Sequence, residues 1–504
     1  MNRVKIFAFA VLVTVFSPCY GQDAKITAYG DKVSAAELRE YLSILASDAM
    51  EGRETGKRGQ KMAAAFLKSH FGDLGLTPPV AGDYIQPLDL YTIAPGDTYI
   101  MAGNKKYENF GDVVFYGNDN SDGEISSSLV FIGKGMEADL VGMDIKGKAV
   151  LILIDGPLLA GNKEISSALE KGATMVFACS TINDDFNNVS KLIKSTLAKA
   201  GLSLTRPEPA DFEAPGIFVI SPTVIPDLAG VSFEKLKEAA NNKNKKALRR
   251  IKPMTVRYKM TTDVKTVKTE NVLGFLEGSD KKDEIVVVTA HYDHIGVKSD
   301  GTGDVINNGA DDDGSGSVAV MEIAKVFSAA KKNGHGPRRS ILFMLVTGEE
   351  FGLLGSEFYT EHPVYPLQNT VVDLNIDMIG RRDPKHKDDA PYLYVIGADK
   401  LSTTLNEVSE SVNNTYSKLN FDYTYNDQAH PDRLYYRSDH WNFAKRNIPI
   451  IFYFDGIHED YHRVSDEVSK IDFELLATRT RCIFYTAWEI ANREERIMPD
   501  KSDK

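Results

Sequence analysis

One short stretch near the middle of the chain constrains its fold more than any other. The run Ile285-Val-Val-Val-Thr-Ala290 follows charged residues and is almost entirely apolar or β-branched, which is typical of a strand buried on both faces. The chain leaves this run with His291, and Asp293 follows two residues later. Ligands bind at the carboxyl ends of strands in open α/β sheets, so an imidazole and a carboxylate here indicate a ligand site. A loop histidine bonded to a nearby aspartate is the simpler alternative, and the other strand ends decide between them.

Length and charge limit the class of protein. With 504 residues the chain is too long for one ordinary domain, so two or more hydrophobic cores are expected. Its 42% hydrophobic and 26% charged residues are typical of a globular protein. The net charge of -12 disfavours nucleic acid and anionic membrane surfaces as partners.

The first 21 residues are predicted to be a signal peptide. A positively charged start leads into the apolar run Ile6–Phe16, which is too short to span a bilayer, and small residues follow. Cleavage would leave Gln22 as the first residue of an exported protein, periplasmic or secreted, with no integral membrane span. A lipoprotein signal acylated at Cys19 is the alternative, although Pro18 directly before that cysteine fits it poorly.

Cleavage would leave two cysteines, Cys179 and Cys482. They lie far apart in the sequence and lack the spacing of a metal site. An exported protein could join them in a disulfide, but the spacing favours two separate buried thiols.

The segment before the central strand divides into two parts. Residues 31–75 are predicted to form two helices, the first starting at the capping box Ser34-Ala-Ala-Glu37 and the second covering about 60–74. From about residue 88 short strands and turns follow. The predicted elements there are strands at 129–132, 149–154 and 175–178, a short helix at 164–171 and a lysine-rich helix at about 233–250. No cluster of His, Asp or Glu follows these strands, which indicates a separate, non-catalytic β-rich module.

After Val264 the pattern returns to long α/β units. Apolar runs predict strands, and two amphipathic segments predict helices. The strands are expected at 271–276, 285–290, 341–346, 371–376 and 448–454, and the helices at 315–330 and 473–492.

Residues that bind metals follow several of these strands. They are His291 with Asp293, the acidic turn Asp311–Asp313, the pair Glu349-Glu350, Asp377, and Tyr461-His462. Two imidazoles and several carboxylates suit zinc. A carboxylate that bridges two ions about 3.5–4 Å apart is the arrangement that aminopeptidases use. One member of the adjacent glutamate pair can bind metal while the other acts as a base.

Each of these features has a plainer interpretation when taken alone. The acidic turn could simply cap a helix, and the glutamate pair could be a solvated helix start. Asp377 is harder to explain in this way, because a buried strand rarely carries an unpaired carboxylate. The coincidence of all five features at one edge of one sheet favours a metal site.

Five motifs resemble the dizinc exopeptidase family of bacterial leucyl aminopeptidase type. They are His291-Tyr-Asp293, Asn308-Gly-Ala-Asp-Asp-Asp-Gly-Ser-Gly316, Gly348-Glu-Glu-Phe-Gly-Leu-Leu-Gly355, Asn375-Ile-Asp377 and Tyr461-His462. The family is related to glutamate carboxypeptidase II, glutaminyl cyclase and the non-enzymatic transferrin receptor. The likeness covers about 264–490, and the helices at 31–75 resemble the lead-in segment of family members. Region 88–255 is similar to a protease-associated domain.

The resemblance implies an α/β fold. The expected architecture is a mixed, mostly parallel sheet with helices on both faces, the phosphorylase/hydrolase-like fold of zinc exopeptidases, plus an inserted smaller β-rich α/β domain. The chain would divide into a signal peptide at 1–21, the helical start of the peptidase domain at 22–88, the insert at 89–258, the zinc peptidase domain at 259–495 and a tail at 496–504.

The resemblance also implies two zinc ions per chain. Asp312 would bridge both ions. His291 and Asp377 would complete one ion, and Glu350 and His462 the other.

The remaining motif residues take supporting roles in this family. Glu349 would be the general base that deprotonates the metal-held water and later protonates the leaving amine. Asp293 would accept the second ring N–H of the zinc-binding imidazole on its own strand end. Tyr461 would donate a hydrogen bond to the oxyanion. Asp311 and Asp313 would shape the loop rather than bind metal.

The leading prediction for the reaction is removal of the N-terminal residue from peptides. A carboxypeptidase of the glutamate carboxypeptidase type is an alternative; it needs a basic patch near the strand 450–454, which here is apolar and aromatic, although Arg437 could serve. A single-zinc glutaminyl cyclase and a zinc-free scaffold are further alternatives. Two, one and zero bound ions correspond to peptidase, cyclase and scaffold.

Overall fold

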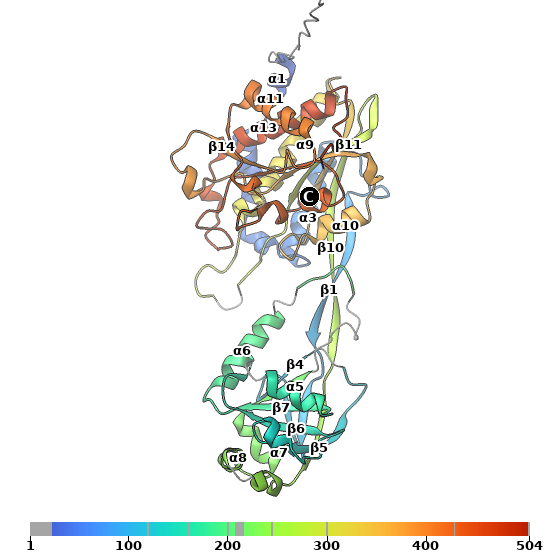
Figure 1. The fold of residues 1–504 in the computed structure, drawn as a ribbon. Helices are drawn as coiled ribbons and strands as arrows, with labels where there is room; N and C mark the ends of the chain where they lie inside the picture. Colours follow the sequence, from blue (N-terminus) through green and yellow to red (C-terminus); the bar gives the residue numbers. More distant parts are fainter. Residues whose placement is uncertain are drawn as a thin grey trace, which may run out of the picture. The chain divides into compact units, whose positions relative to one another are not determined.

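The computed structural model describes residues 23–501 except 118–119, 159–161, 199–200, 207–215, 243–244, 299–300 and 428. The predicted signal peptide and its lipoprotein alternative therefore lie outside the described residues. The chain forms two compact units (Figure 1): Met1–Leu88 with Lys268–Lys504, here the main unit, and Asp89–Val267, here the inserted unit. The predicted insert ended at residue 258, whereas the inserted unit continues into the strand β10 (Thr262–Leu276).

The main unit is built on one eight-stranded sheet with the order β1-β10-β12-β11-β13-β16-β14-β15. The central four strands, β12, β11, β13 and β16, are parallel to one another, and so are β14 and β15. Two pairings are antiparallel: β10 with β12, and β14 with β16. The bounds are β1 Ile85–Pro95, β11 Lys281–His291, β12 Arg339–Val346, β13 Thr370–Ile376, β14 Tyr392–Ile396, β15 Asn420–Asp422 and β16 Ile450–Phe454. The predicted mixed, mostly parallel sheet is confirmed.

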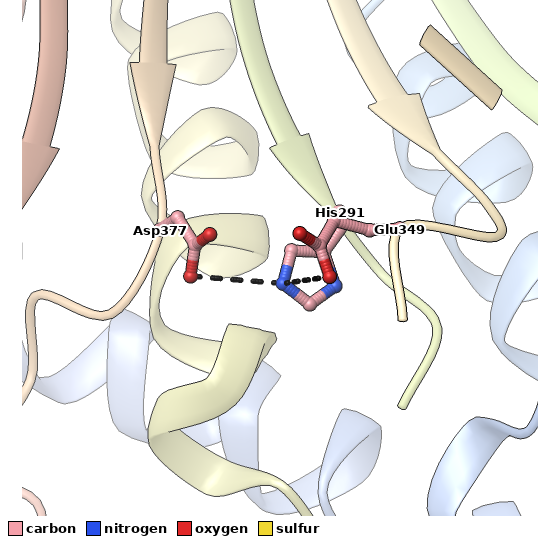
Figure 2. A group of neighbouring side chains, drawn as sticks. All are labelled: His291, Glu349 and Asp377. Carbon is pink, nitrogen blue, oxygen red and sulfur yellow. Dashed lines mark ion pairs between the residues drawn. The ribbon is translucent and has the colours of Figure 1, made fainter. Parts of the chain in front are cut away.

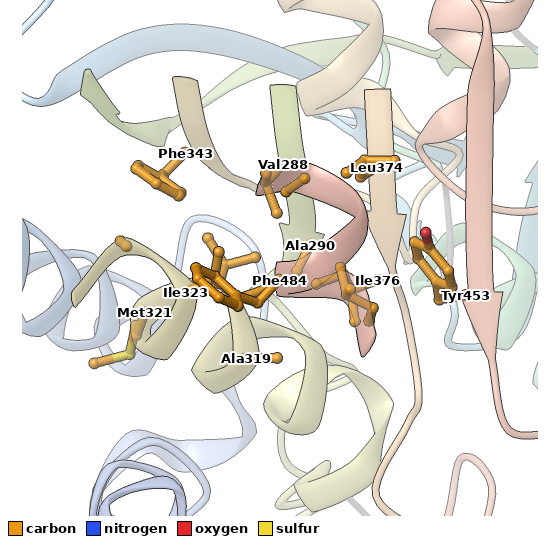
Figure 3. Packing of buried hydrophobic residues seen from close by; sticks show 14 of the residues in the cluster. Val288, Ala290, Ala319, Met321, Ile323, Phe343, Leu374, Ile376, Tyr453 and Phe484 are labelled. Carbon is orange, nitrogen blue, oxygen red and sulfur yellow. The ribbon is translucent and has the colours of Figure 1, made fainter. Parts of the chain in front are cut away.

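Helices cover both faces of this sheet. Successive residues of β11 alternate between two cores: Val286 and Val288 pack with one set of helices, and Ile285 and Val287 pack on the other face. Figure 3 shows part of the first core, where Phe484 lies among residues of the sheet and of α9. The helices are α1 Ala24–Gly30, α2 Ala35–Leu45, α3 Arg58–Asp73, α9 Gly316–Lys332, α10 Leu354–Glu361, α11 Thr403–Val412, α12 His440–Ala444 and α13 Phe473–Asn492. Burying each large apolar side chain contributes about 1.5–3 kcal/mol to the stability of the fold. An unbroken apolar run therefore lies in the middle of the sheet, where both of its faces are covered.

The capping box predicted at the start of α2 is only half formed. The hydroxyl of Ser34 accepts the Glu37 N–H at 3.3 Å, as expected. In a complete capping box the Glu37 carboxylate would accept the Ser34 N–H. Here the Ser34 N–H donates to Glu322 of α9 at 2.8 Å, and Glu37 pairs with Lys325 instead. Glu322 is fully buried and needs donors, so it takes the bond that Glu37 was predicted to make.

The inserted unit has its own eight-stranded sheet, with the order β3-β2-β9-β5-β6-β7-β8-β4. Its strands are β2 Tyr99–Ala102, β3 Lys105–Glu108, β4 Val113–Tyr116, β5 Ile125–Phe131, β6 Ala149–Ile154, β7 Met175–Ser180, β8 Ile217–Ile220 and β9 Met254–Lys259. Its helices are α4 Glu137–Leu140, α5 Asn162–Glu170, α6 Asp185–Ala198, α7 Ile225–Ala229 and α8 Phe233–Asn241. The long lysine-rich helix predicted at 233–250 is wrong, because α8 ends at Asn241 and a 3-10 helix follows at Lys245–Arg250.

The two cysteines of the described chain, Cys179 and Cys482, are both buried and free, as predicted. Burial raises the pKa of each thiol to about 12. Among the described helices, none is both long and apolar enough to cross a membrane.

Candidate metal centre

Three parallel strands bring their carboxyl ends together in the main unit. His291 is the last residue of β11, Asp377 directly follows β13, and Glu349 lies in the loop after β12. Strand β11 lies between the other two, with His291 paired to Val346 of β12 in the register. The three side chains therefore converge from adjacent strand ends (Figure 2).

His291 faces three carboxylates. Its Nε2 atom lies 3.3 Å from Asp312 Oδ1, 3.6 Å from Asp377 Oδ1 and 3.9 Å from Glu349 Oε2. The imidazole is buried, as are Asp312 and Asp377.

The other oxygen of Asp312 faces a second group. His462 Nε2 is 3.1 Å from Asp312 Oδ2 and also 3.1 Å from Glu350 Oε2. His294 Nδ1 lies 2.7 Å from Glu350 Oε1 and 3.8 Å from Asp312 Oδ2. Asp312 thus turns one oxygen to each group, which is the geometry of a bridging ligand.

Two sets of side chains are close enough together to hold an ion each: His291, Glu349 and Asp377, and His294, Asp312 and Glu350. The first set contains the predicted ligands His291 and Asp377, with the predicted base Glu349 beside them. The second contains His294 in place of the predicted His462; no sequence motif pointed to His294, although it lies three residues after His291 at the same strand end. Nε2 of His294 is buried with no hydrogen-bond partner among the described residues.

The charges of the centre fit a cation. In the described chain, no lysine or arginine forms an ion pair with Asp312, Glu349, Glu350 or Asp377. Burial opposes the charged form of His462, yet its contacts with Asp312 and Glu350 raise the pKa of this imidazole to about 10. Burial, with the nearby charges of Asp377 and Glu350, raises the pKa of Glu349 well above its usual range. Excess buried acid next to imidazoles matches the ligand chemistry of zinc.

Asp293 differs from its predicted role. The Nδ1 atom of His291 is 3.1 Å from the backbone carbonyl oxygen of Asp293, but 3.8 Å from its carboxylate. The carboxylate accepts instead the Thr55 hydroxyl at 2.7 Å and the Glu349 backbone N–H at 3.2 Å. Asp293 therefore fixes the backbone of Glu349, while its carbonyl oxygen orients the imidazole.

The outer members of the acidic turn shape its loop, as predicted. Asp313 Oδ1 accepts the N–H of Gly316 at 2.9 Å and of Met378 at 3.0 Å, and Asp311 Oδ1 accepts the N–H of Gly380 at 2.7 Å. A side chain at Gly316 would meet the Asp313 carboxylate at 2.4 Å, so this position requires glycine. These bonds tie the turn before α9 to the loop that follows β13.

Two further residues support the centre and were missed from sequence. Ser438 donates from Oγ to Asp377 Oδ2 at 2.6 Å. Arg53 is fully buried and donates to the backbone carbonyls of Asn308 and Gly309 at 2.7 and 2.8 Å. Both act across long sequence separations, which no local pattern reveals.

A pocket opens beside the centre. Besides His291, Asp312, Glu349 and Asp377, it is lined by Met378, Leu434, Arg437, Phe452, Phe454, Ile457 and Tyr461. The Tyr461 ring stacks on His462 with centroids 3.9 Å apart. Burial, followed by the charges of Asp312 and Glu350, raises the pKa of Tyr461, so its phenol stays protonated and can donate a hydrogen bond.

The fold is an α/β sheet whose strand ends gather acids and imidazoles, an arrangement that suits a zinc site. Residues 271–487, which lie in the main unit, match the sequence model of peptidase family M28.

Curated relatives include an aminopeptidase, YwaD, of Bacillus subtilis, which is 28% identical over 258 residues, 50% of each chain. Leucine aminopeptidase 2 of Trichophyton rubrum is 28% identical over 247 residues, 44% of this chain and 45% of the relative. The chain spans about half the length of the curated relatives it matches. Among solved structures, an aminopeptidase from Aneurinibacillus sp. strain AM-1 aligns with a TM-score of 0.48 and 18% identity, covering 94% of this chain and 97% of that one.

Proposed function

We propose that the protein is a zinc-dependent aminopeptidase that removes the N-terminal residue of peptides, with two zinc ions per chain. The observation that carries this proposal is the placement of Asp312, which turns one oxygen to His291 and the other to His462. Zinc bound there would supply Lewis-acid polarisation of the scissile carbonyl and would make water more acidic. The match of residues 271–487 to a peptidase family and the relatives named as aminopeptidases support the same reaction class.

Glu349 is the general base in this proposal. It faces the pocket beside His291, and the Asp293 carboxylate holds its backbone N–H. Glu349 takes a proton from the attacking water and later gives it to the leaving amine. Such a group typically contributes about 10²–10⁴-fold to the rate.

Tyr461 is proposed to stabilise the negative charge that develops on the carbonyl oxygen. Its protonated phenol lines the pocket, and its ring is held against His462. A hydrogen bond aimed at the developing charge lowers the barrier more than it strengthens substrate binding.

The pocket wall supports an uncharged N-terminal side chain. Phe452 and Phe454 of β16, with Ile457 in the following loop, form an apolar lining. Arg437, an exposed cation on the same pocket, favours the carboxypeptidase alternative, because it could bind a substrate carboxylate. The choice of substrates must therefore distinguish an aminopeptidase from a carboxypeptidase.

The test combines metal content by plasma emission with cleavage of free-amine and N-acetylated aminoacyl amides. Glu349→Gln should keep both zinc ions and lose activity by about 10²–10⁴-fold. The matched control is its neighbour: Glu350→Gln should lose zinc together with activity. Two zinc ions in the wild type with cleavage of free amines alone would support the aminopeptidase.

Other outcomes identify the alternatives. Two zinc ions with cleavage only next to a free C-terminal carboxylate would mean a carboxypeptidase. One zinc with cyclisation of N-terminal glutamine would mean a cyclase. No bound zinc and no cleavage would mean a binding scaffold.

A further inference from the structure

The loop after β16 connects several parts of the metal centre. We call residues 455–466 the β16 loop. It carries Tyr461 and His462, and it ends at Asp466, a buried acid that neither lines the pocket nor belongs to either set of candidate ligands.

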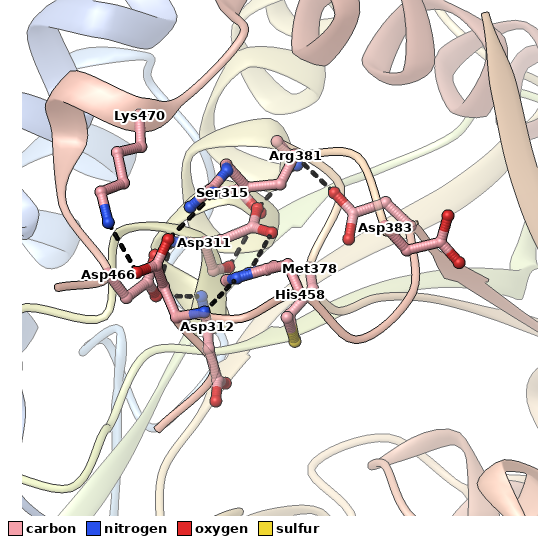
Figure 4. Close-up of polar contacts among 12 residues, drawn as sticks. Asp311, Asp312, Ser315, Met378, Arg381, Asp383, His458, Asp466 and Lys470 are labelled. Carbon is pink, nitrogen blue, oxygen red and sulfur yellow. Dashed lines mark hydrogen bonds and ion pairs between the residues drawn. The ribbon is translucent and has the colours of Figure 1, made fainter. Parts of the chain in front are cut away.

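Asp466 binds the backbone of the acidic turn. Its carboxylate accepts the N–H of Asp311 at 3.0 Å and the N–H of Asp312 at 3.1 Å. Its own carbonyl oxygen accepts the N–H of Ala310 at 3.2 Å. Three consecutive N–H groups of the turn therefore point at one residue of the β16 loop, as Figure 4 shows for Asp311 and Asp312.

These N–H groups need an external acceptor. They lie just before α9, where the backbone of Asp312 has φ −96° and ψ 103° and is not helical. Backbone donors at the start of a helix have no carbonyl partner within it, and buried donors without partners are costly. A carboxylate accepts two such bonds more strongly than a neutral group does. Asp466 therefore determines where the backbone of Asp312 lies.

A second contact joins the same two segments. Asp311 Oδ2 lies 3.2 Å from Nε2 of His458, which is also part of the β16 loop and is buried. The loop that supplies His462 is thus attached to the turn that supplies Asp312 at two points, Asp466 and His458 (Figure 4).

We propose that Asp466 is a positioning residue that sets the bridging carboxylate of Asp312 relative to His462. This inference rests on the proposed function, because it takes Asp312 to be shared by two zinc ions. The inference can be recognised by the number of zinc ions whose binding is weakened. Displacing a shared ligand weakens both ions, whereas disturbing an unshared ligand weakens one.

The experiment measures zinc binding directly. Asp466→Asn keeps the size of the side chain but removes the negative charge that strengthens these bonds, and its amide nitrogen cannot accept the Asp311 N–H as the second carboxylate oxygen does at 3.1 Å. Wild type and variant are stripped with a chelator and titrated with zinc against a chromophoric competitor. Both ions are expected to bind about 10–100-fold more weakly, the usual effect of losing an outer partner of a metal ligand.

Two control variants interpret the result. Ser438→Ala removes the hydroxyl that donates to Asp377, an unshared ligand, and should weaken one ion only. Glu322→Gln alters a buried carboxylate that accepts a backbone N–H from Ser34 but contacts no candidate ligand. It should lower the melting temperature and leave zinc binding unchanged.

The thermal shift gives a second readout. Positioning predicts that zinc raises the melting temperature of Asp466→Asn less than that of the wild type. A purely structural role predicts equal losses with and without zinc and unchanged zinc affinity, and would overturn the inference. Weakening of a single ion would overturn it too. If Asp466→Asn does not fold, Asp466→Glu decides, because it keeps the acceptor but shifts it by one methylene and should also weaken both ions. A wild type that binds no zinc would refute the proposed function itself.

Discussion

Both units of the molecule contain adjacent parallel strands, but among the described residues only the main unit gathers acids and imidazoles at the strand ends. In the inserted unit, Asp155 directly follows β6, as Asp377 follows β13 in the main unit. Asp155 forms an ion pair with Lys134 and accepts the Thr181 hydroxyl, and these contacts lower the pKa of its carboxyl. Asp377 lies instead against His291 and other acids.

The difference shows that the architecture supplies the place and the residues supply the chemistry. Parallel strands bring their carboxyl ends together in either unit. A lysine neutralises the acid in one, while in the other the excess negative charge fits a bound cation. Histidine distribution follows the same division: all ten histidines of the chain lie in the main unit, and residues 89–267 contain none.

The largest effect is expected from a cavity in the inserted unit. Phe177 of β7 is fully buried and stacks on Phe218 with ring centroids 5.3 Å apart. Phe177→Ala should lower the free energy of unfolding by about 3–5 kcal/mol, and Phe177→Leu by much less. Because the two units have separate cores, hydrogen exchange should accelerate in β6 and β7 and not in β11. Equal acceleration in both units would show that they unfold together.

The strand-end acids provide the second test. If Asp377 binds zinc as proposed, Asp377→Asn should weaken zinc binding and lower kcat/KM by on the order of 100-fold, because the amide lacks the negative charge that would bind the metal. Asp155→Asn is the matched substitution at the corresponding position of the inserted unit, and it should leave both quantities unchanged. Comparable losses in the two variants, measured by zinc titration and peptide cleavage, would contradict the division of roles between the units.

The third effect is a pH dependence confined to the main unit. His440 is fully buried beside Phe452, and burial lowers the pKa of its imidazole from 6.5 to about 3. The unfolded chain binds a proton here below pH 6.5 while the folded chain does not, so stability is lost as pH falls from 6.5 towards 3. Between pH 7 and pH 5 the loss should be about 2 kcal/mol.

The control is His440→Gln, whose amide nitrogen reaches about as far as the imidazole Nε2 and can still donate to the carbonyl of Tyr435, the acceptor of the His440 Nε2–H at 2.8 Å. Denaturant unfolding of zinc-free wild type and variant at both pH values isolates the contribution of His440. Identical pH dependence in the two proteins would mean that this imidazole titrates normally.

Sequence patterns predicted the central elements well, because these depend on local composition. The run 149–154 is β6 without change, and the closing helix predicted at 473–492 is α13. Strand β15 has only three residues, too few for a pattern, and its place follows from pairing with β14. Helix α6 was missed although Phe186, Val189 and Ile193 repeat at helical spacing.

The metal centre was predictable only in part. Strand ends converge whenever parallel strands are adjacent, so His291, Asp377 and the glutamate pair could be grouped from sequence. The hydrogen-bond partner of an individual atom could not be predicted from sequence. Asp466 meets Asp312 across 154 residues of sequence, and the Asp293 carboxylate turns to Thr55 instead of His291. Such contacts depend on how distant loops pack, which no local pattern records.

The smallest effect should be the same in both units. Ser34 caps α2 by accepting the Glu37 N–H at 3.3 Å, and Ser232 caps α8 by accepting the Lys235 N–H at the same distance. Replacing either serine with alanine should lower the free energy of unfolding by about 1 kcal/mol, because each helix loses one side-chain acceptor at its start. The Ser34 backbone N–H keeps its bond to Glu322 in the variant, so that contact adds no further loss. Denaturant titration of both variants measures the two losses in the free energy of unfolding. A clearly larger loss for Ser34→Ala would show that the hydroxyl also supports the buried Glu322 contact, and that the two units differ in their helix starts as well as at their strand ends.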